Sequence, residues 1–425
     1  MKYIVVCLSL ILAVATVPNT IYSQEDAGDV RSLDQAITLA LENNPDARAA
    51  ESAWQAAREN VTVSSAWPEP QLSFTQFVES VETRNGPQNQ QIAVNQMIPL
   101  WGTTGLNRTI AQRQTAKAKQ DYAAAKRKVI AKVKSAWADL YWIDSSIETV
   151  LEYQELVGTF RDIAETRYAT GKGMQTSVLK AQLERSKLDE RLLNLREMRS
   201  TFLHNLNSLL NRPIDAPVES IDTLALPEYN FTESQLMDSL ATYRQDLRGL
   251  QAMIEANRAK VSLKEKMNLP SLGVGMNYIT IGNTSLPGAP APGTDAVAVM
   301  AKIDLPLWFG ANKARVQKAK LGLSKVQYRY ADKRNAAEAE VRTIHYRIQQ
   351  TRESLALYDS TLIPQAEQTL QSALSAYKTG SVSFLDLLDS ERMIVQFTLN
   401  YYKEQATYFK RLAELEQAVG TDLNL

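Results

Sequence analysis

The chain has 425 residues, of which 44% are hydrophobic and 22% charged, and its 47 Lys and Arg balance its 47 Asp and Glu. Nucleic-acid-binding proteins carry a basic excess, so this zero balance argues against a nucleic-acid partner. A chain of this length usually forms more than one structural unit, because a single hydrophobic core stops growing at about 250–300 residues.

The N-terminal segment 1–23 has the layout of a secretory signal peptide. Lys2 precedes an apolar run over 4–17, and 21–23 is a candidate cleavage site. The alternative is a transmembrane anchor, but the run is shorter than the ~20 residues that a helical span needs. Cys7, the only cysteine, lies inside this segment, so the mature chain is expected to have no disulfide and no thiolate chemistry.

Four short motifs occur twice in the same order, and this indicates an internal duplication. The matching pairs are Asp46-Ala47-Arg48 with Asp246-Leu247-Arg248, Pro70-Gln71-Leu72 with Pro270-Ser271-Leu272, Pro99-Leu100-Trp101 with Pro306-Leu307-Trp308, and Tyr168-Ala169-Thr170-Gly171 with Tyr377-Lys378-Thr379-Gly380. We therefore predict a first structural repeat over 24–232 and a second repeat of the same design over 233–425.

Each repeat is predicted to contain a helix, two strands, a very long helix and a returning helix. In the first repeat these are expected at 32–66, 70–79, 89–99, 106–169 and 175–210. In the second repeat they are expected at 233–267, 271–281, 295–306, 312–377 and 383–419.

The predicted strands alternate between apolar residues and small or polar residues. In the last strand Val297, Val299 and Ile303 fall on one face, whereas Ala298 and Lys302 fall on the other. Strands of about ten residues with this alternation occur in outer-membrane barrels. A soluble antiparallel sheet has the same period, so one strand alone leaves both possibilities open.

Tryptophans stand where the predicted strands meet the helices. Trp67, Trp101 and Trp308 occupy these junctions, and indole rings prefer the membrane–water boundary, so we predict that they are membrane-interface aromatics. Four strands cannot close a barrel, for which about eight is the usual minimum, and an open edge is not tolerated in lipid. A membrane location therefore requires several copies of the chain.

The long helices carry apolar residues at seven-residue spacing. The residues are Val129, Ala136, Ile143, Val150 and Val157 in the first repeat and Val341, Ile348, Leu355 and Leu362 in the second. Sustained heptads predict coiled-coil packing. A helix over 106–169 would be roughly 95 Å long at ~1.5 Å per residue, so a rod or tube is expected, with a kink at Pro364.

The doubled Tyr-x-Thr-Gly turns and Pro-Leu-Trp junctions resemble the outer membrane factor family, the TolC-like ducts of tripartite efflux pumps, over essentially the whole mature chain. This resemblance implies a mainly α fold with membrane β: a homotrimer with four β-strands per chain in a shared 12-stranded β-barrel, plus a long coiled-coil α-helical periplasmic tube. It implies a passive channel in outer-membrane lipid, with a large periplasmic portion, that works with a periplasmic adaptor (a membrane fusion protein) and an inner-membrane pump. The segments 70–72, 86–88 and 96–99 are similar to the heavy-metal (copper/silver-type) efflux branch.

The resemblance assigns roles to residues next to the two turns. Asp386 and Asp389 would form acidic rings that line the periplasmic aperture and select cations, and Tyr377 would help to hold the tip shut. The usual acidic partner of that tyrosine falls at Ser177 and the usual arginine at Val382, so closure is expected to rest on other contacts, including packing of Tyr377 and Phe384. A simpler interpretation of the two aspartates is that they favour the helix dipole at its N-terminus.

The turns themselves would meet the adaptor. The expected adaptor-contact residues are Thr170, Gly171, Lys172, Thr379, Gly380 and Ser381. The simpler interpretation is a tight helix–helix turn, and both can be true.

No constellation of residues predicts an enzyme. The two histidines, His204 and His345, have no cysteine or carboxylate at metal-ligand spacing, and no Ser/His/Asp arrangement is evident. We therefore expect no catalytic residue, no metal site and no cofactor. The alternative to a duct is a periplasmic coiled-coil structural or adaptor protein with a small soluble sheet.

Overall fold

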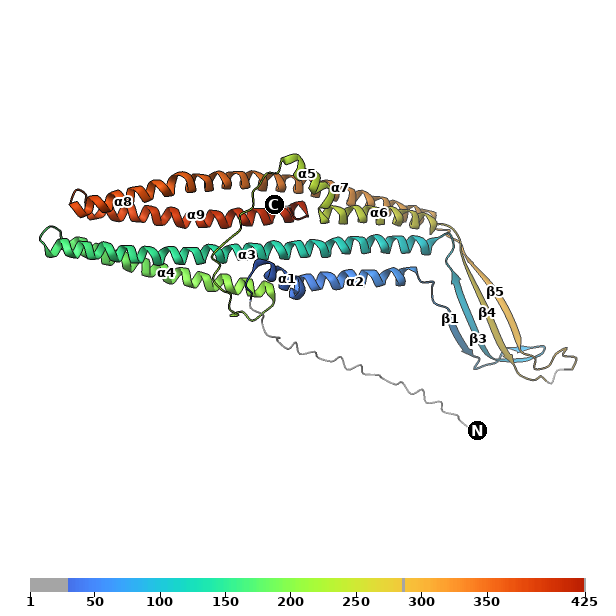
Figure 1. The fold of residues 1–425 in the computed structure, drawn as a ribbon. Coiled ribbons are helices and arrows are strands. Elements are labelled where there is room, and N and C mark those ends of the chain that lie inside the picture. The colour runs from blue at the N-terminus through green and yellow to red at the C-terminus, as the bar shows by residue number, and fades with distance from the viewer. Residues whose placement is uncertain (1–29, 285–286, 424–425) are drawn as a thin grey trace, which may run out of the picture.

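The computed structural model describes residues 30–284 and 287–423, so the predicted signal segment with Cys7 lies outside the described residues. The molecule is an elongated rod in which helices run side by side, with a small sheet at one end and two hairpin turns at the other (Figure 1). No helix in the described part of the chain is both long enough and apolar enough to cross a membrane.

The two halves of the chain contain their helices in the same order. The first half contains α1 (Leu33–Asn43), α2 (Pro45–Ser65), α3 (Thr103–Ala169) and α4 (Gln175–Leu210). The second half contains α5 (Glu233–Tyr243), α6 (Gln245–Lys266), α7 (Phe309–Leu357), the π-helical turn η1 (Tyr358–Leu362), α8 (Ile363–Thr379) and α9 (Phe384–Val419). The boundary between the proposed repeats, at residues 232 and 233, stays a prediction.

The single helices expected at 32–66 and 233–267 are each two helices, and that expectation was wrong in detail. Pro45 begins α2, and the Asn44 side chain accepts hydrogen bonds from the two N–H groups that follow it, which caps the new helix. At the matching place in the second half, Arg244 leaves the helical conformation and donates a hydrogen bond to the carbonyl of Ala418 at 2.5 Å. Local capping and a tertiary contact therefore override the continuous helical pattern.

The irregularity expected at Pro364 takes the form of a widened helical turn. The π-helical residues Tyr358–Leu362 come directly before α8, which has Pro364 in its first turn. Proline has no N–H to donate and its ring crowds the carbonyl four residues earlier, so the regular ladder cannot continue through it.

Four strands form the antiparallel sheet in the order β1-β3-β4-β5. Their bounds are Gln71–Gln76 for β1, Gly86–Ile98 for β3, Ser271–Ile281 for β4 and Ala296–Asp304 for β5. A short additional strand, β2 (Glu82–Thr83), pairs with β3 near the end of the rod. The central β3–β4 pair joins the two halves of the chain, and β1 and β5 are the edges within one chain.

The strand register places the apolar side chains on one face of the sheet. One row runs across all four strands, because Leu72 lies opposite Val94, Val94 opposite Met276, and Met276 opposite Val299. The neighbouring row contains Phe74, Ile92, Tyr278 and Val297, and all eight of these side chains are exposed. Ala93 and Asn277, between the two rows, point to the other face. The alternation expected of the strands is thus observed, and a wide apolar face has no cover from the described residues of one chain.

The rod is organised around α3, which spans 67 residues and packs against α1, α2, α4, α6 and α9. Its heptad residues form the seam of the helical layer. Those residues, Val129, Ala136, Ile143, Val150 and Val157, are all buried, and so are Val341 and Ile348 of α7. The apolar seven-residue spacing therefore marks the packed face of α3 and of the first part of the heptad in α7, whereas Leu355 is half-buried and Leu362 lies in η1.

Candidate functional site

The two hairpin turns lie side by side at the end of the rod opposite the sheet (Figure 1). Gly171 and Gly380 each adopt a left-handed conformation, with φ of 70° and 87°. The residue after each glycine donates its N–H to a carbonyl in the last turn of the preceding helix, at 2.8 and 2.9 Å. This geometry ends a helix and suits glycine. All six predicted adaptor-contact residues are exposed here: Thr170, Gly171, Lys172, Thr379, Gly380 and Ser381.

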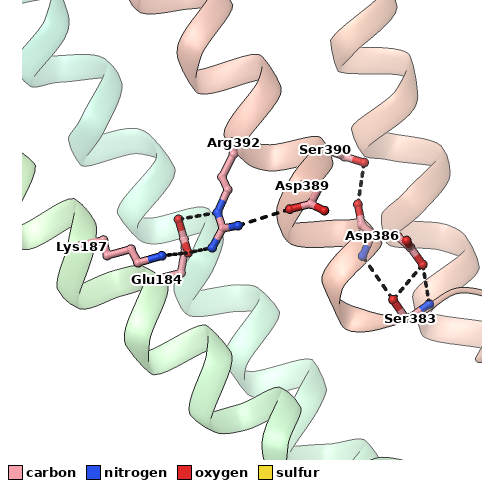
Figure 2. A network of polar contacts seen from close by, with 7 residues as sticks. All are labelled: Glu184, Lys187, Ser383, Asp386, Asp389, Ser390 and Arg392. Atoms are coloured by element: carbon pink, nitrogen blue, oxygen red, sulfur yellow. Dashed lines mark hydrogen bonds and ion pairs between the residues drawn. The ribbon is translucent and has the colours of Figure 1, made fainter.

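Asp386 caps the helix that follows the second turn. Its Oδ2 accepts hydrogen bonds from the N–H and the hydroxyl of Ser383 at 2.9 and 2.8 Å, and the hydroxyl of Ser383 accepts from the Asp386 N–H at 3.3 Å (Figure 2). The hydrogen bonds from the side chain and backbone of Ser383 lower the pKa of the Asp386 carboxyl. Asp386 is therefore both a capping residue and an exposed, ionised group.

Asp389 belongs to a charge network that joins the two hairpins. Arg392 of α9 donates to Asp389 Oδ1 at 3.2 Å and, across the hairpins, to Glu184 Oε1 of α4 at 3.0 Å, with a second bond to Glu184 Oε2 (Figure 2). Lys187 approaches Glu184 to 3.6 Å. Burial of Glu184 opposes its ionisation, but the Arg392 guanidinium outweighs this and lowers the pKa of Glu184. Part of the charge of Asp389 is thus balanced within its own chain.

Glu391 lies beside this network in an unusual environment. Its side chain is 1% exposed, and neither carboxylate oxygen has a hydrogen-bond partner among the described residues. Burial and the nearby charge of Glu184 raise the pKa of Glu391 to about 7, although Arg392 and Arg191 act in the opposite direction. The group therefore titrates near neutral pH where the helices of both hairpins meet.

Tyr377 packs as expected against Phe384. Their ring centroids are 5.2 Å apart in an edge-on arrangement, and both side chains are buried. Ser177 is buried as well, but no hydrogen bond joins it to Tyr377, whose hydroxyl has no partner among the described residues. Arg167 of α3 instead lies over the Tyr377 ring, 5.0 Å from its centroid.

The three tryptophans lie at the other end of the long helices. Trp67 follows α2, Trp101 precedes α3 and Trp308 precedes α7, and all three are exposed where the helices meet the sheet. The indole N–H of Trp101 donates to the carbonyl of Pro270 at 2.8 Å, so this ring also ties together the junctions of the two halves.

The sequence reasoning missed four residues of the tip region: Arg167, Glu184, Glu391 and Arg392. A signal for three of them was available, because the dipeptide Glu-Arg occurs in both returning helices, at 184–185 and at 391–392. Both glutamates of this repeated pair are buried. Arg167 carries no such signal, since the matching residue before the second turn is Ala376.

Comparison with known proteins places this geometry in a family. The family model described as outer membrane efflux protein matches residues 36–212 and 236–421. The chain is 21% identical over 406 residues to outer membrane protein TolC of Vibrio cholerae, covering 92% of this chain and 91% of the relative. It is also 21% identical over 408 residues to the cobalt-zinc-cadmium resistance protein CzcC of Cupriavidus metallidurans, covering 94% and 92%.

A solved structure has the same fold. The outer membrane protein VceC of Vibrio cholerae superposes with a TM-score of 0.76 at 20% identity, covering 92% of this chain and 96% of VceC. The TolC-like fold expected from the sequence is thereby confirmed, and so is the interpretation of the chain as a duct for efflux located in the outer membrane. The chain belongs to the outer membrane efflux protein family.

Proposed function

We propose that three copies of the chain form one passive duct that receives cargo from an inner-membrane pump through a periplasmic adaptor and releases it outside the cell. The observation that carries this proposal is the apolar face of the sheet, whose rows run without interruption across all four strands. Such a face is stable against lipid, whereas in water it would promote aggregation. It therefore disfavours the alternative of a soluble periplasmic coiled-coil protein.

The two edges of the sheet indicate how many copies of the chain are needed. In the part of one chain that the structure describes, β1 and β5 lack an outer neighbour, and unpaired strand edges are not tolerated in the hydrocarbon region of a membrane. If β5 of one copy pairs with β1 of the next, three copies supply twelve strands and close the sheet. The same arrangement would set the helices side by side as a tube.

The aperture is proposed to lie at the hairpin tips. Three copies of Asp386 and Asp389 would form two acidic rings, which favour cations over anions. Because Arg392 balances part of the charge of Asp389, whereas the Asp386 carboxylate has only the neutral donors of Ser383 in the described part of the chain, we expect Asp386 to contribute more to the selectivity. The exposed turns around Gly171 and Gly380 are the proposed adaptor contacts.

Metal ions are a proposed cargo, and other small molecules remain alternatives. One relative is named for cobalt, zinc and cadmium resistance, and the segments noted above are similar to the heavy-metal branch. A cation-selective aperture would suit such cargo. The proposal predicts that deletion of the gene lowers tolerance to divalent metals more than tolerance to organic drugs.

The channel proposal is tested with purified protein in a planar bilayer. The expected result is a detergent-stable trimer that inserts and shows a small conductance with cation preference, and Asp386→Asn should reduce that preference. A monomer that needs no detergent would overturn the trimer. An ion preference that is unchanged in the double variant Asp386→Asn, Asp389→Asn would overturn the aperture assignment.

A further inference from the structure

Arg167 of α3 touches both hairpin turns of its own chain. Its Nη1 donates to the carbonyl oxygens of Tyr377 and Lys378 at 2.5 and 2.9 Å, and its Nη2 donates to the carbonyl of Lys172 at 3.0 Å. Lys172 lies in the first turn, whereas Tyr377 and Lys378 lie in the last turn of α8. One guanidinium thus bridges two hairpins that are 210 residues apart in the chain.

These contacts match what the end of a helix requires. The last carbonyls of a helix lack a partner within it and carry partial negative charge, so a cation is favourable there. Arg167 supplies this cation to α8 from the neighbouring hairpin and also lies over the face of the Tyr377 ring. The planar, forked guanidinium can bond several carbonyls at once, which an ammonium cannot do with the same geometry.

The contact is built into one side of the duplication only. Ala376 stands before the second turn where Arg167 stands before the first, so the second hairpin has no equivalent side chain. Gly380 leaves room for the guanidinium, because a Cβ at this position would lie 2.9 Å from Arg167 Nη2. The glycine therefore serves both the left-handed turn and the approach of Arg167.

We infer that Arg167 is a positioning residue of the gate, which holds the α8–α9 tip against the α3–α4 tip in the closed duct. This inference rests on the proposed function. The acceptors are backbone carbonyls and an aromatic ring, so this contact involves no carboxylate, unlike the Arg392–Glu184 pair, and makes no use of the Tyr377 hydroxyl. It differs in this respect from a lock based on an ion pair or on a bond between Tyr377 and Ser177.

Hydrogen exchange at the tips of the purified trimer tests the inference directly. Arg167→Ala should lower the protection of amides over 376–384 by about tenfold or more, because a charge-assisted hydrogen bond changes an equilibrium by at least that factor. Arg161→Ala is the matched control, since Arg161 lies on the same helix but, within 30–284 and 287–423, pairs with its neighbours Asp162 and Glu165 and not with the second hairpin. Tyr377→Phe keeps the ring and the carbonyl and should leave the protection unchanged.

Conductance in a planar bilayer is the second readout. It tests the Arg167 contact between the tips, here called the latch, separately from the proposal that the protein is a channel. Arg167→Ala should raise the open time of the channel, whereas Arg161→Ala and Tyr377→Phe should behave as wild type. Unchanged exchange at 376–384 in Arg167→Ala would overturn the latch, whatever the conductance. Tip opening equally large in Tyr377→Phe would overturn it in favour of the hydroxyl. Faster exchange in Arg167→Ala without conductance in any variant would support the latch and refute the channel.

Discussion

Replacing Glu391 by glutamine should remove a pH dependence that is built into the junction of the two hairpins. The wild-type carboxyl is 1% exposed and has no hydrogen-bond donor among the described residues. Burial, with the nearby charge of Glu184, raises its pKa from 4.5 to about 7. Glutamine has nearly the same shape and cannot ionise, so it isolates the effect of the charge.

The raised pKa of Glu391 decides whether this carboxyl stabilises the packed junction at low or at high pH. An unfolded or opened chain ionises this carboxyl near pH 4.5, whereas the packed structure keeps its proton until about pH 7. The stabilising contribution is therefore fully present below pH 4.5 and is lost as the pH rises through 7. At about 1.4 kcal/mol per pKa unit, the packed junction loses about 3 kcal/mol by pH 8.

Hydrogen exchange of the α9 amides around residue 391 measures this loss. The ratio of protection between Glu391→Gln and wild type should rise by about a hundredfold between pH 5 and pH 8, since ~1.4 kcal/mol corresponds to tenfold. The comparison at each pH cancels the chemical pH dependence of exchange. Glu414→Gln is the matched control, because Glu414 lies on the same helix but is exposed, and it should show no such change.

A protection ratio that is equal at pH 5 and pH 8 would refute the argument that Glu391 is buried as a neutral acid. The carboxylate would then have a cationic partner at both values of pH. A second result against it would be an equal rise, between pH 5 and pH 8, in the ratio of protection between Glu414→Gln and wild type, because this would place the titrating group elsewhere.

Three further predictions concern the tips. Asp386→Asn should weaken the cation preference of the conductance more than Asp389→Asn does, and the opposite order would contradict the role given to Arg392. Gly380→Val should lower export while the trimer and its membrane location persist, because φ of 87° is strained for a β-branched residue and the side chain would displace Arg167; loss of the trimer on a native gel would indicate a folding role. Arg392→Met leaves Glu184 buried without its main partner and should destabilise the hairpin junction by about 2–3 kcal/mol, which is less than for a fully buried pair because the Arg392 side chain is 41% exposed. The thermal midpoint of the trimer checks this, and an unchanged midpoint would mean that the bridge is dispensable.

Local patterns were enough to predict most of the architecture. Period-two alternation identified the strands and the apolar face, because neighbouring side chains in a strand must point to opposite sides. Heptads such as Val129, Ala136 and Ile143 identified the buried seam of α3, since the helical period sets which residues share a face. The doubled motifs then placed the elements in two matching series and led to the family.

The breaks within the first helices were harder to predict. Asn44 followed by Pro45 is a local signal for a new helix, and the amphipathic pattern on both sides concealed it. At Arg244 no proline is present, and the conformation depends on a contact with Ala418, which is far away in the chain.

The contacts that close the tip were decided by the tertiary structure alone. Arg167 meets Tyr377 across 210 residues, and Arg392 meets Glu184 across 208. Which side chains face each other there depends on the rotation and relative height of two long helical hairpins, and a repeating sequence pattern does not reveal either. The sequence by itself therefore determined the order of elements in the two halves, the apolar face of the sheet and the position of the turns. The sequence also showed that Ser177 takes the place of the usual acidic partner, but only the packing of one hairpin on the other determined that the Arg167 guanidinium reaches backbone carbonyls of both tips.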